Sequence, residues 1–153
     1  MKHPILAFLS LGASFFIISP AFCINSLQDT HRAAQYFMDE LNYTTNVVEV
    51  KSVIEGKKEK SAVIVDTRAA KDFAEGHIPG AINLPYTDYA SFEGSEKEFP
   101  GLKKDQLNYV YCYELLCNLS QKACKKFASL GYPVKDIKGG FKSWKEHDYP
   151  IEK

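Results

Sequence analysis

The sequence predicts an α/β domain in which short strands alternate with helices and pair into one mainly parallel sheet. An unbroken apolar run at Ser61–Asp66 is typical of a strand buried on both faces, as parallel strands are. A β-rich run at Tyr109–Cys112 is followed, after a loop, by apolar residues at helical spacing from Leu119 to Leu130. This alternation favours right-handed crossovers between parallel strands. The 153 residues are enough for one domain with a core of its own.

Two helices are expected before the first long strand. Residues 24–43 predict an N-terminal helical extension, with Asp29 and Thr30 as candidate caps. The apolar positions of this helix are Leu27, Ala34, Phe37, Met38 and Leu41. We expect it to pack across the domain or to extend its edge. Asn46 and Glu49 then make a capping pair for a second helix.

The later elements follow from apolar runs and turn residues. The expected order is a short helix within Thr67–Gly76, a turn at His77–Gly80, a strand at Ala81–Leu84, a loop with a little helix at Tyr86–Gly101, a strand at Val134–Ile137 and a short helix after Gly139–Gly140. The sequence contains no internal repeat and no sign of a second domain.

The first 23 residues predict a secretory signal peptide. A basic start, Met1–His3, precedes an apolar run of about 15 residues and then small residues near its end. The small-x-small rule allows cleavage after Ala21 or after Cys23. A membrane span usually needs about 20 apolar residues, so no stable membrane anchor is expected after cleavage. The sequence therefore predicts an exported protein, either periplasmic or secreted.

The charge balance and the cysteines narrow the function. Lys+Arg and Asp+Glu both number 19, whereas a nucleic-acid-binding surface usually shows a basic excess, so no nucleic-acid partner is expected. The four cysteines are Cys23, Cys112, Cys117 and Cys124. The last three are too few and too close together for a disulfide framework, even in an oxidising compartment. We expect them to belong to a site.

Three motifs resemble those of rhodanese-like domains. Val65–Arg68 with Phe73–Pro85 is similar to the family's first signature, Val110–Cys112 to its active-site strand and cysteine, and Gly139–Trp144 to its C-terminal signature. The motifs stand in the family's order within residues 44–153. The resemblance implies a doubly wound α/β domain with a roughly five-stranded, mainly parallel sheet flanked by helices. It also implies sulfur transfer through a cysteine persulfide, without a cofactor.

The resemblance assigns the catalytic role to Cys112. The loop after Cys112 is longer than the family's usual loop. It resembles the loop of a variant of the family that has the pattern Cys-x4-Cys-Asn at this place. Its residues are Tyr113, Glu114, Leu115, Leu116, Cys117, Asn118 and Ser120. Ser120 takes the family's helix-start serine position, and Leu119 stands where the family has an Arg. Since the loop contains no Arg or Lys, it offers no cation to an anionic donor such as thiosulfate.

Sulfur attack requires Cys112 as a thiolate. An ordinary thiol has a pKa of about 8.5, so the site is expected to lower it. A helix N-terminus contributes only about 0.3–1 kcal/mol, so loop N–H groups are expected to supply the rest as an anion nest. Glu114 opposes this shift unless its carboxylate points to solvent, as we expect. Cys117 is either a resolving thiol that forms a disulfide with Cys112 or a free cysteine lining the pocket, and Cys124 is expected in the core.

Asp66 and Arg68 are expected at the same edge of the sheet as Cys112. Either Arg68 supplies positive potential near the loop or ties it in place with Asp66, or the two residues form an ion pair that stabilises the fold. Glu75 and His77 are expected to orient the turn beside them rather than to act as acid and base. The pattern of His and Cys residues predicts no metal site.

Three functions agree with the sequence. The first is an exported sulfurtransferase that holds sulfane sulfur as a persulfide on Cys112 and passes it to a thiol or another nucleophile. Its partners are a small sulfur compound and a thiol acceptor, which includes the thiol of a partner protein. The second is a thiol redox protein that uses Cys112 and Cys117. The third is a non-catalytic rhodanese-like binding module, favoured by the missing basic residue in the loop.

Overall fold

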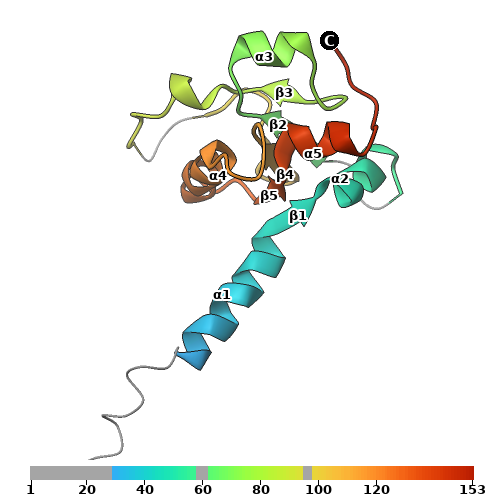
Figure 1. Ribbon diagram of the computed structural model, residues 1–153. Helices are drawn as coiled ribbons and strands as arrows, with labels where there is room; N and C mark the ends of the chain where they lie inside the picture. Colours follow the sequence, from blue (N-terminus) through green and yellow to red (C-terminus); the bar gives the residue numbers. More distant parts are fainter. Residues whose placement is uncertain (1–28, 58–61, 95–97) are drawn as a thin grey trace, which may run out of the picture.

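The computed structural model describes residues 29–57, 62–94 and 98–153, and Figure 1 shows its ribbon. The predicted signal peptide lies outside the described residues. Five parallel strands form one sheet in the order β1-β5-β4-β2-β3 within the described part of the chain. The strands are β1 (Thr44–Asn46), β2 (Ala62–Asp66), β3 (Ile82–Asn83), β4 (Leu107–Tyr111) and β5 (Val134–Lys138). The helices are α1 (Thr30–Tyr43), α2 (Val47–Ile54), α3 (Ala70–Glu75), α4 (Leu119–Ser129), α5 (Gly140–Glu146) and the 3-10 helix η3 (Tyr86–Asp88).

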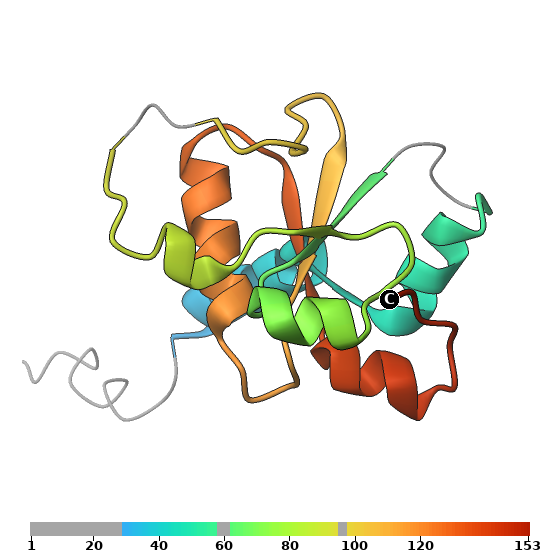
Figure 2. The same ribbon diagram turned by 90° about the horizontal axis from the view of Figure 1, so that it is seen from above.

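Helices cover both faces of the sheet. Side chains alternate between the faces along β4: Tyr109 and Tyr111 join the core that contains Trp144 of α5, whereas Val110 joins the core that contains Phe127 of α4. Figure 2 shows α4 on one side of the strands and α2 with α5 on the other. The predicted α/β class and the doubly wound arrangement are therefore confirmed.

Most predicted elements lie close to their expected positions. The capping pair of α2 is present, because Oδ1 of Asn46 accepts a hydrogen bond from the N–H of Glu49 at 2.9 Å. The strand expected at Ala81–Leu84 is shorter and spans Ile82–Asn83. The sequence pattern does not predict β1, because three residues are too few to show a period.

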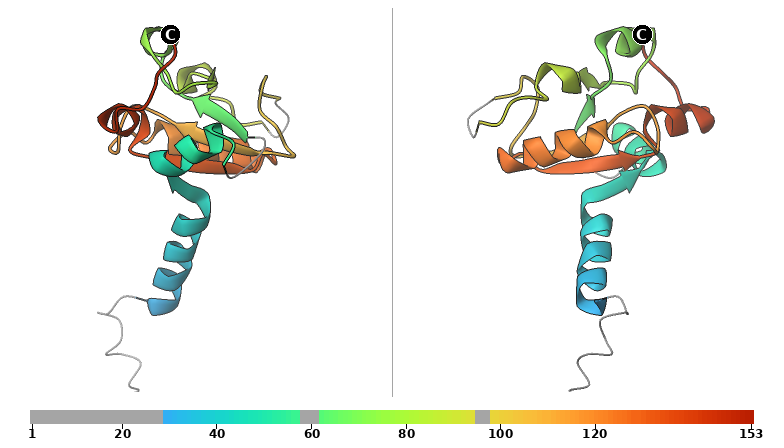
Figure 3. Two further views of the ribbon diagram at one scale, coloured as in Figure 1. Left: turned by 90° about the vertical axis from the view of Figure 1, so that its right-hand side faces the viewer. Right: turned by 60° about the vertical axis from the view of Figure 1, so that its left-hand side comes forward.

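Helix α1 stands apart from the rest of the domain. It begins after Asp29, whose Oδ1 accepts from the N–H groups of His31 and Arg32, both at 3.1 Å. It has no buried residue, and it projects away from the sheet in Figures 1 and 3. Of the two expected placements, it therefore extends the edge of the domain, where Glu40 pairs with Lys138 at 3.0 Å. Among the described helices, none combines the length and apolar character that a membrane crossing needs.

Candidate active site

The candidate site lies at the carboxyl ends of β2 and β4, which are neighbours in the sheet. Tyr111 pairs with Asp66 in the register of these strands, so Cys112 and Thr67 are the residues that follow each strand. Thr67 ties the two strand ends together, because its N–H and its Oγ1 both donate to the Tyr111 carbonyl, at 3.0 and 2.8 Å. Ligands of α/β sheets bind at this edge. The structure thus places Cys112 at the sheet edge that the sequence predicts.

The N-terminal end of α5 holds the loop from the other side. The N–H of Phe141 donates to the Cys112 carbonyl at 2.9 Å, and the N–H of Lys142 donates to the Tyr113 carbonyl at 2.8 Å. At Gly140 the φ angle is +56°, and a Cβ there would meet the Cys112 carbonyl oxygen at 2.5 Å. A glycine is therefore needed at this position both for the turn and for the close approach of α5 to the loop.

The thiol of Cys112 is enclosed by its own loop. The residue is 1% exposed, its Sγ–H donates to the Cys117 carbonyl at 3.1 Å, and Oγ of Ser120 donates to the sulfur at 3.4 Å. Burial, followed by the Cys117 side chain, raises the pKa of Cys112 to about 11 against a smaller lowering by Ser120. The expected lowering is therefore wrong for this arrangement. The buried sulfur faces a carbonyl acceptor, and both conditions favour the protonated thiol.

The other two cysteines have different surroundings. Cys117 is half-buried, and its N–H donates to the Glu114 carbonyl at 3.0 Å, which turns the loop back toward Cys112. Cys124 packs against the core that contains Phe127, and burial raises the pKa of its thiol. The expectation that Cys124 belongs to the core is confirmed. All three cysteines of the described residues are free thiols.

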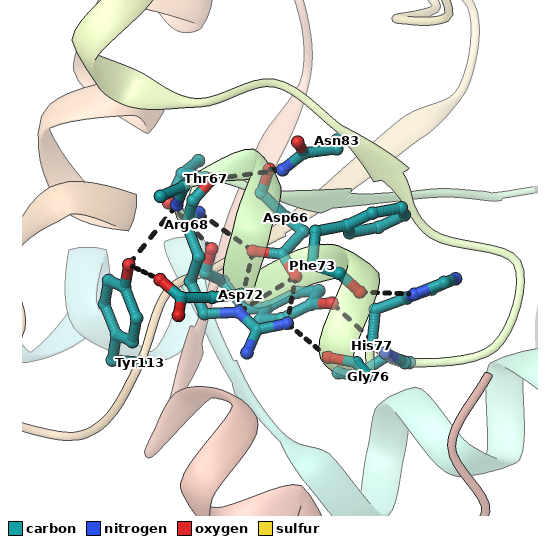
Figure 4. Close-up of polar contacts among 12 residues, drawn as sticks. Asp66, Thr67, Arg68, Asp72, Phe73, Gly76, His77, Asn83 and Tyr113 are labelled. Atoms are coloured by element: carbon teal, nitrogen blue, oxygen red, sulfur yellow. Dashed lines mark hydrogen bonds and ion pairs between the residues drawn. The ribbon is translucent and has the colours of Figure 1, made fainter. Parts of the chain in front are cut away.

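Tyr113 fastens the loop to α3, as Figure 4 shows. Its hydroxyl donates to Oδ2 of Asp72 at 2.5 Å and accepts from the N–H of Ala69 at 3.3 Å. Burial, followed by the hydrogen bond to Asp72, raises the pKa of the Tyr113 phenol, so the hydroxyl keeps its proton and donates it to the carboxylate. Because Tyr113 directly follows Cys112, this contact orients the chain beside the sulfur.

The other loop side chains lie at the surface. Glu114 forms an ion pair with Lys142 at 3.3 Å and keeps 45% of its side chain exposed, so its carboxylate faces solvent as expected. Leu115 and Leu116 are 71% and 89% exposed. Asn118 is the N-cap residue of α4, although its side chain makes no capping hydrogen bond.

Asp66 and Arg68 form a buried ion pair, drawn in Figure 4. Nη2 of Arg68 lies 2.6 Å from Oδ2 of Asp66 and 2.7 Å from the Gly76 carbonyl, which it also contacts as a donor. The guanidinium also lies over the Phe141 ring, 4.0 Å from its centroid. Burial alone lowers the pKa of Arg68, but Asp66 and, to a smaller extent, Tyr111 together outweigh burial and raise it. Because the Arg68 guanidinium is already paired with Asp66, Gly76 and Phe141, it is not a free charge near the loop. The structure therefore favours the role of an ion pair that stabilises the fold.

His77 has the orienting role expected for it. Its ring stacks on Phe73 with centroids 3.7 Å apart, and its Nδ1 lies 3.0 Å from the Phe73 carbonyl. Its backbone exchanges two hydrogen bonds with Glu152, which joins the turn to the C-terminal segment. Across residues 29–57, 62–94 and 98–153, no group of three or more His, Cys, Asp or Glu residues is arranged to hold a metal ion.

Two cations near the site are missed by sequence reasoning that is confined to the loop. A hollow of about 600 Å³ adjoins the loop, and Lys142 and Lys145 of α5 line it together with Tyr113 and Glu114. A signal for these lysines is present in the chain order. Helix α5 follows β5, the neighbour of β4, so its N-terminal end meets the sheet edge that carries Cys112.

Known proteins share this architecture. The family model described as a rhodanese-like domain matches residues 46–147, and the chain belongs to the rhodanese-like family. The thiosulfate sulfurtransferase GlpE of Pseudomonas putida is 36% identical over 100 residues, which cover 65% of this chain and 83% of that protein. The adenylyltransferase and sulfurtransferase uba4 of Sclerotinia sclerotiorum is 35% identical over 101 residues, or 59% of this chain. The chain spans only 22% of the length of uba4.

Solved structures show the same fold. The BH2092 protein of Bacillus halodurans superposes with a TM-score of 0.63 at 27% identity, over 81% of this chain and 86% of that one. A protein from Lactobacillus plantarum superposes with a TM-score of 0.64 at 22% identity, over 81% of this chain and 99% of that one, a likeness that shows the fold alone. The fold is thus rhodanese-like, and the sequence relatives include sulfurtransferases.

Proposed function

We propose that this protein is an exported sulfurtransferase that carries sulfane sulfur as a persulfide on Cys112. The observation that carries the proposal is the position of this cysteine at the carboxyl end of β4, with Ser120 donating to its sulfur and α5 holding its carbonyl. The family match and the sulfurtransferase relatives support the same chemistry.

The reaction has two displacements. The Cys112 thiolate attacks the outer sulfur of a donor such as thiosulfate, an S–S bond forms, and the donor's own S–S bond breaks with release of sulfite. An acceptor thiolate then attacks the outer sulfur of the persulfide and returns Cys112 as a thiolate. Lys142 and Lys145 line the hollow beside the loop together with the carboxylates of Asp72, Glu75 and Glu114, so in this proposal Lys142 leaves its ion pair with Glu114 to attract an anionic donor.

Ionisation of Cys112 is the costly step. With a pKa of about 11, removing the thiol proton at pH 7 costs about 5 kcal/mol. A helix N-terminus supplies only about 0.3–1 kcal/mol, so it does not offset this cost. The proposal therefore includes a shift of the loop when donor binds, in which the sulfur leaves the Cys117 carbonyl while keeping the Ser120 hydrogen bond.

Substitution of two cysteines tests the proposal. Cys112→Ser should abolish sulfur transfer from thiosulfate or benzenethiosulfonate to cyanide, because the nucleophile is gone. Cys124→Ser is the matched control, because this thiol belongs to helix α4 and packs against the core that contains Phe127, and it should keep transfer. Transfer that persists in folded Cys112→Ser would reject the assignment, and no transfer by the unsubstituted protein would favour the non-catalytic binding module.

A thiol redox protein is the second candidate function. The contact between the Cys112 thiol and the Cys117 carbonyl favours it, because it brings the two residues together. Equilibration with glutathione buffers of graded potential should then produce a reversible disulfide between them. A chain that stays fully reduced under every buffer, by mass after alkylation, would exclude this function.

Export is part of the same proposal and rests on the predicted signal peptide. Expression of the full chain in a bacterial host, followed by cell fractionation and N-terminal sequencing, should give a periplasmic protein that starts at Phe22 or Ile24. A cytoplasmic protein that still begins at Met1 would contradict export.

A further inference from the structure

We propose that Cys117 resolves the persulfide on Cys112, so that the protein reduces sulfane sulfur to sulfide. This inference rests on the proposed sulfur transfer and adds a product, free sulfide, and a second reacting residue. It differs from a simple dithiol redox protein because the sulfur donor itself supplies the oxidising equivalents.

The geometry of the loop carries the inference. The Cys112 thiol is hydrogen-bonded to the carbonyl of Cys117 at 3.1 Å. The turn from Glu114 to Cys117 holds this arrangement through a backbone hydrogen bond of 3.0 Å. The backbone of Cys117 therefore already contacts the atom that would carry the sulfur, which keeps the Cys117 residue beside it.

Access to the sulfur points to an internal acceptor. Cys112 is 1% exposed, so the donor and an external acceptor thiol both have to displace the loop to reach its sulfur. Cys117 belongs to the loop itself, so it is at hand when the loop closes again after the donor has reacted, whereas an external thiol has to displace the loop a second time. The leucines between the two cysteines, Leu115 and Leu116, are 71% and 89% exposed, so moving them to form a disulfide removes no buried side chain from the core.

The chemistry balances without an additional oxidant. First, Cys112 takes the outer sulfur of thiosulfate, and sulfite leaves with the thiol proton as hydrogen sulfite. Next, the Cys117 thiolate attacks the inner sulfur of the persulfide, the Cys112 Sγ atom. The new S–S bond joins the two cysteines, and the outer sulfur departs with the electron pair of the broken bond and the Cys117 proton as hydrogen sulfide anion. The sulfane sulfur is reduced by two electrons, and the two thiols are oxidised by two.

A dithiol reductant completes the cycle. The half-buried Cys117 is the more accessible end of the new disulfide, and a dithiol protein or a small dithiol attacks it. The overall reaction converts the donor and a dithiol into sulfide, the donor's leaving group and an oxidised dithiol.

The experiment is a single turnover of reduced full-chain protein with benzenethiosulfonate and no added thiol. Intact mass and released sulfide are followed for the unsubstituted protein, for Cys117→Ser, for Cys117→Ala and for Cys124→Ser as the matched control. The unsubstituted protein and Cys124→Ser should release one sulfide per chain and lose about 2 Da as the Cys112–Cys117 disulfide forms. Both Cys117 variants should instead hold a gain of about 32 Da on Cys112 and release sulfide at least about tenfold more slowly.

Two results separate failure of this inference from failure of the proposed function. If the unsubstituted protein keeps the gain of about 32 Da and releases sulfide no faster than Cys117→Ser, persulfide transfer stands and resolution by Cys117 is overturned. If neither the unsubstituted protein nor the Cys117 variants take up sulfur while remaining folded, the sulfur transfer on which the inference rests is overturned with it.

Discussion

The pKa of the Cys112 thiol is set by neighbouring groups with opposite effects. Burial and the side chain of Cys117 hold its proton, whereas Ser120 favours the thiolate, and the balance raises the pKa of Cys112 to about 11. The sulfur therefore rests as a thiol in this loop conformation. The reactivity of the Cys112 sulfur then depends on how the loop moves when a donor binds. Cys117 and Ser120 should shift the pKa of Cys112 in opposite directions.

Alkylation measures this balance. In a Cys124→Ser background, the rate of Cys112 modification by iodoacetamide should rise with pH toward a midpoint near 11, because only the thiolate reacts. Ser120→Ala should move the midpoint higher and Cys117→Ala should move it lower. Mass spectrometry of the Cys112 peptide gives the rate. A midpoint near the ordinary thiol value of about 8.5 would contradict the effect of burial.

The Asp66–Arg68 pair is the second feature decided by single residues. Arg68→Met should lower the free energy of unfolding by about 3–5 kcal/mol, because it leaves the fully buried Asp66 carboxylate without its cation. Lys71→Met is the control, since it breaks an exposed pair with Glu75 at 3.9 Å and should cost about 0–1 kcal/mol. Urea unfolding gives both values. Equal losses in the two variants would contradict the structural role of the buried pair.

At the scale of elements, the loop after β4 is held by three neighbours. Tyr113 contacts α3, Thr67 bonds the end of β4, and the first turn of α5 bonds two loop carbonyls. The close approach at Gly140 is the least tolerant of these contacts, because the neighbouring atom is backbone and cannot rotate away.

A pair of glycine substitutions isolates that contact. Gly140→Ala places a Cβ 2.5 Å from the Cys112 carbonyl oxygen, whereas Gly131→Ala has the same sign of φ, at +83°, and no atom within 4 Å. Both carry backbone strain of about 1–3 kcal/mol. Gly140→Ala should in addition reduce sulfur uptake by at least about tenfold, a loss of about 1.4 kcal/mol or more. Similar uptake rates for the two folded variants would show that α5 does not position the loop.

Sequence patterns recover the long elements and the position of Cys112. The apolar run of β2 and the helical spacing of α4 are visible in the chain, and so is the place of Cys112 at a strand end. The protonation state of the Cys112 thiol cannot be predicted from the sequence, because its pKa depends on which groups the folded loop turns toward the sulfur. Lys142 is missed for a related reason: it comes from another element, and only the order of strands in the sheet brings it to the loop.

At the scale of the whole molecule, the sheet and its two helical layers are separate from α1. The domain core draws on residues from α2 to the C-terminal segment, and α1 contributes no buried residue to it. Its side chains Tyr36, Phe37, Met38 and Leu41 are all more than half exposed. The rhodanese-like domain should therefore keep its stability without most of this helix.

Truncation tests this independence. A chain that starts at Asp39 should unfold within a few degrees of one that starts at Ile24, because it keeps the Glu40–Lys138 pair and β1. A chain that starts at Val47 is the control and should lose far more, since it lacks the strand that pairs with β5. Thermal unfolding by circular dichroism compares them. A large loss on removal of residues 24–38 alone would contradict the separation.

The sulfur-carrying role that we propose for Cys112 is tested by mapping the sulfur itself. The Cys117→Ser variant is treated with benzenethiosulfonate, its remaining thiols are alkylated, and the peptides are analysed by tandem mass spectrometry. We expect one added sulfur, about 32 Da, on Cys112, and its discharge when cyanide or a thiol is added. Added sulfur on Cys124 instead, or none on a folded protein, would contradict the assignment of sulfur transfer to Cys112.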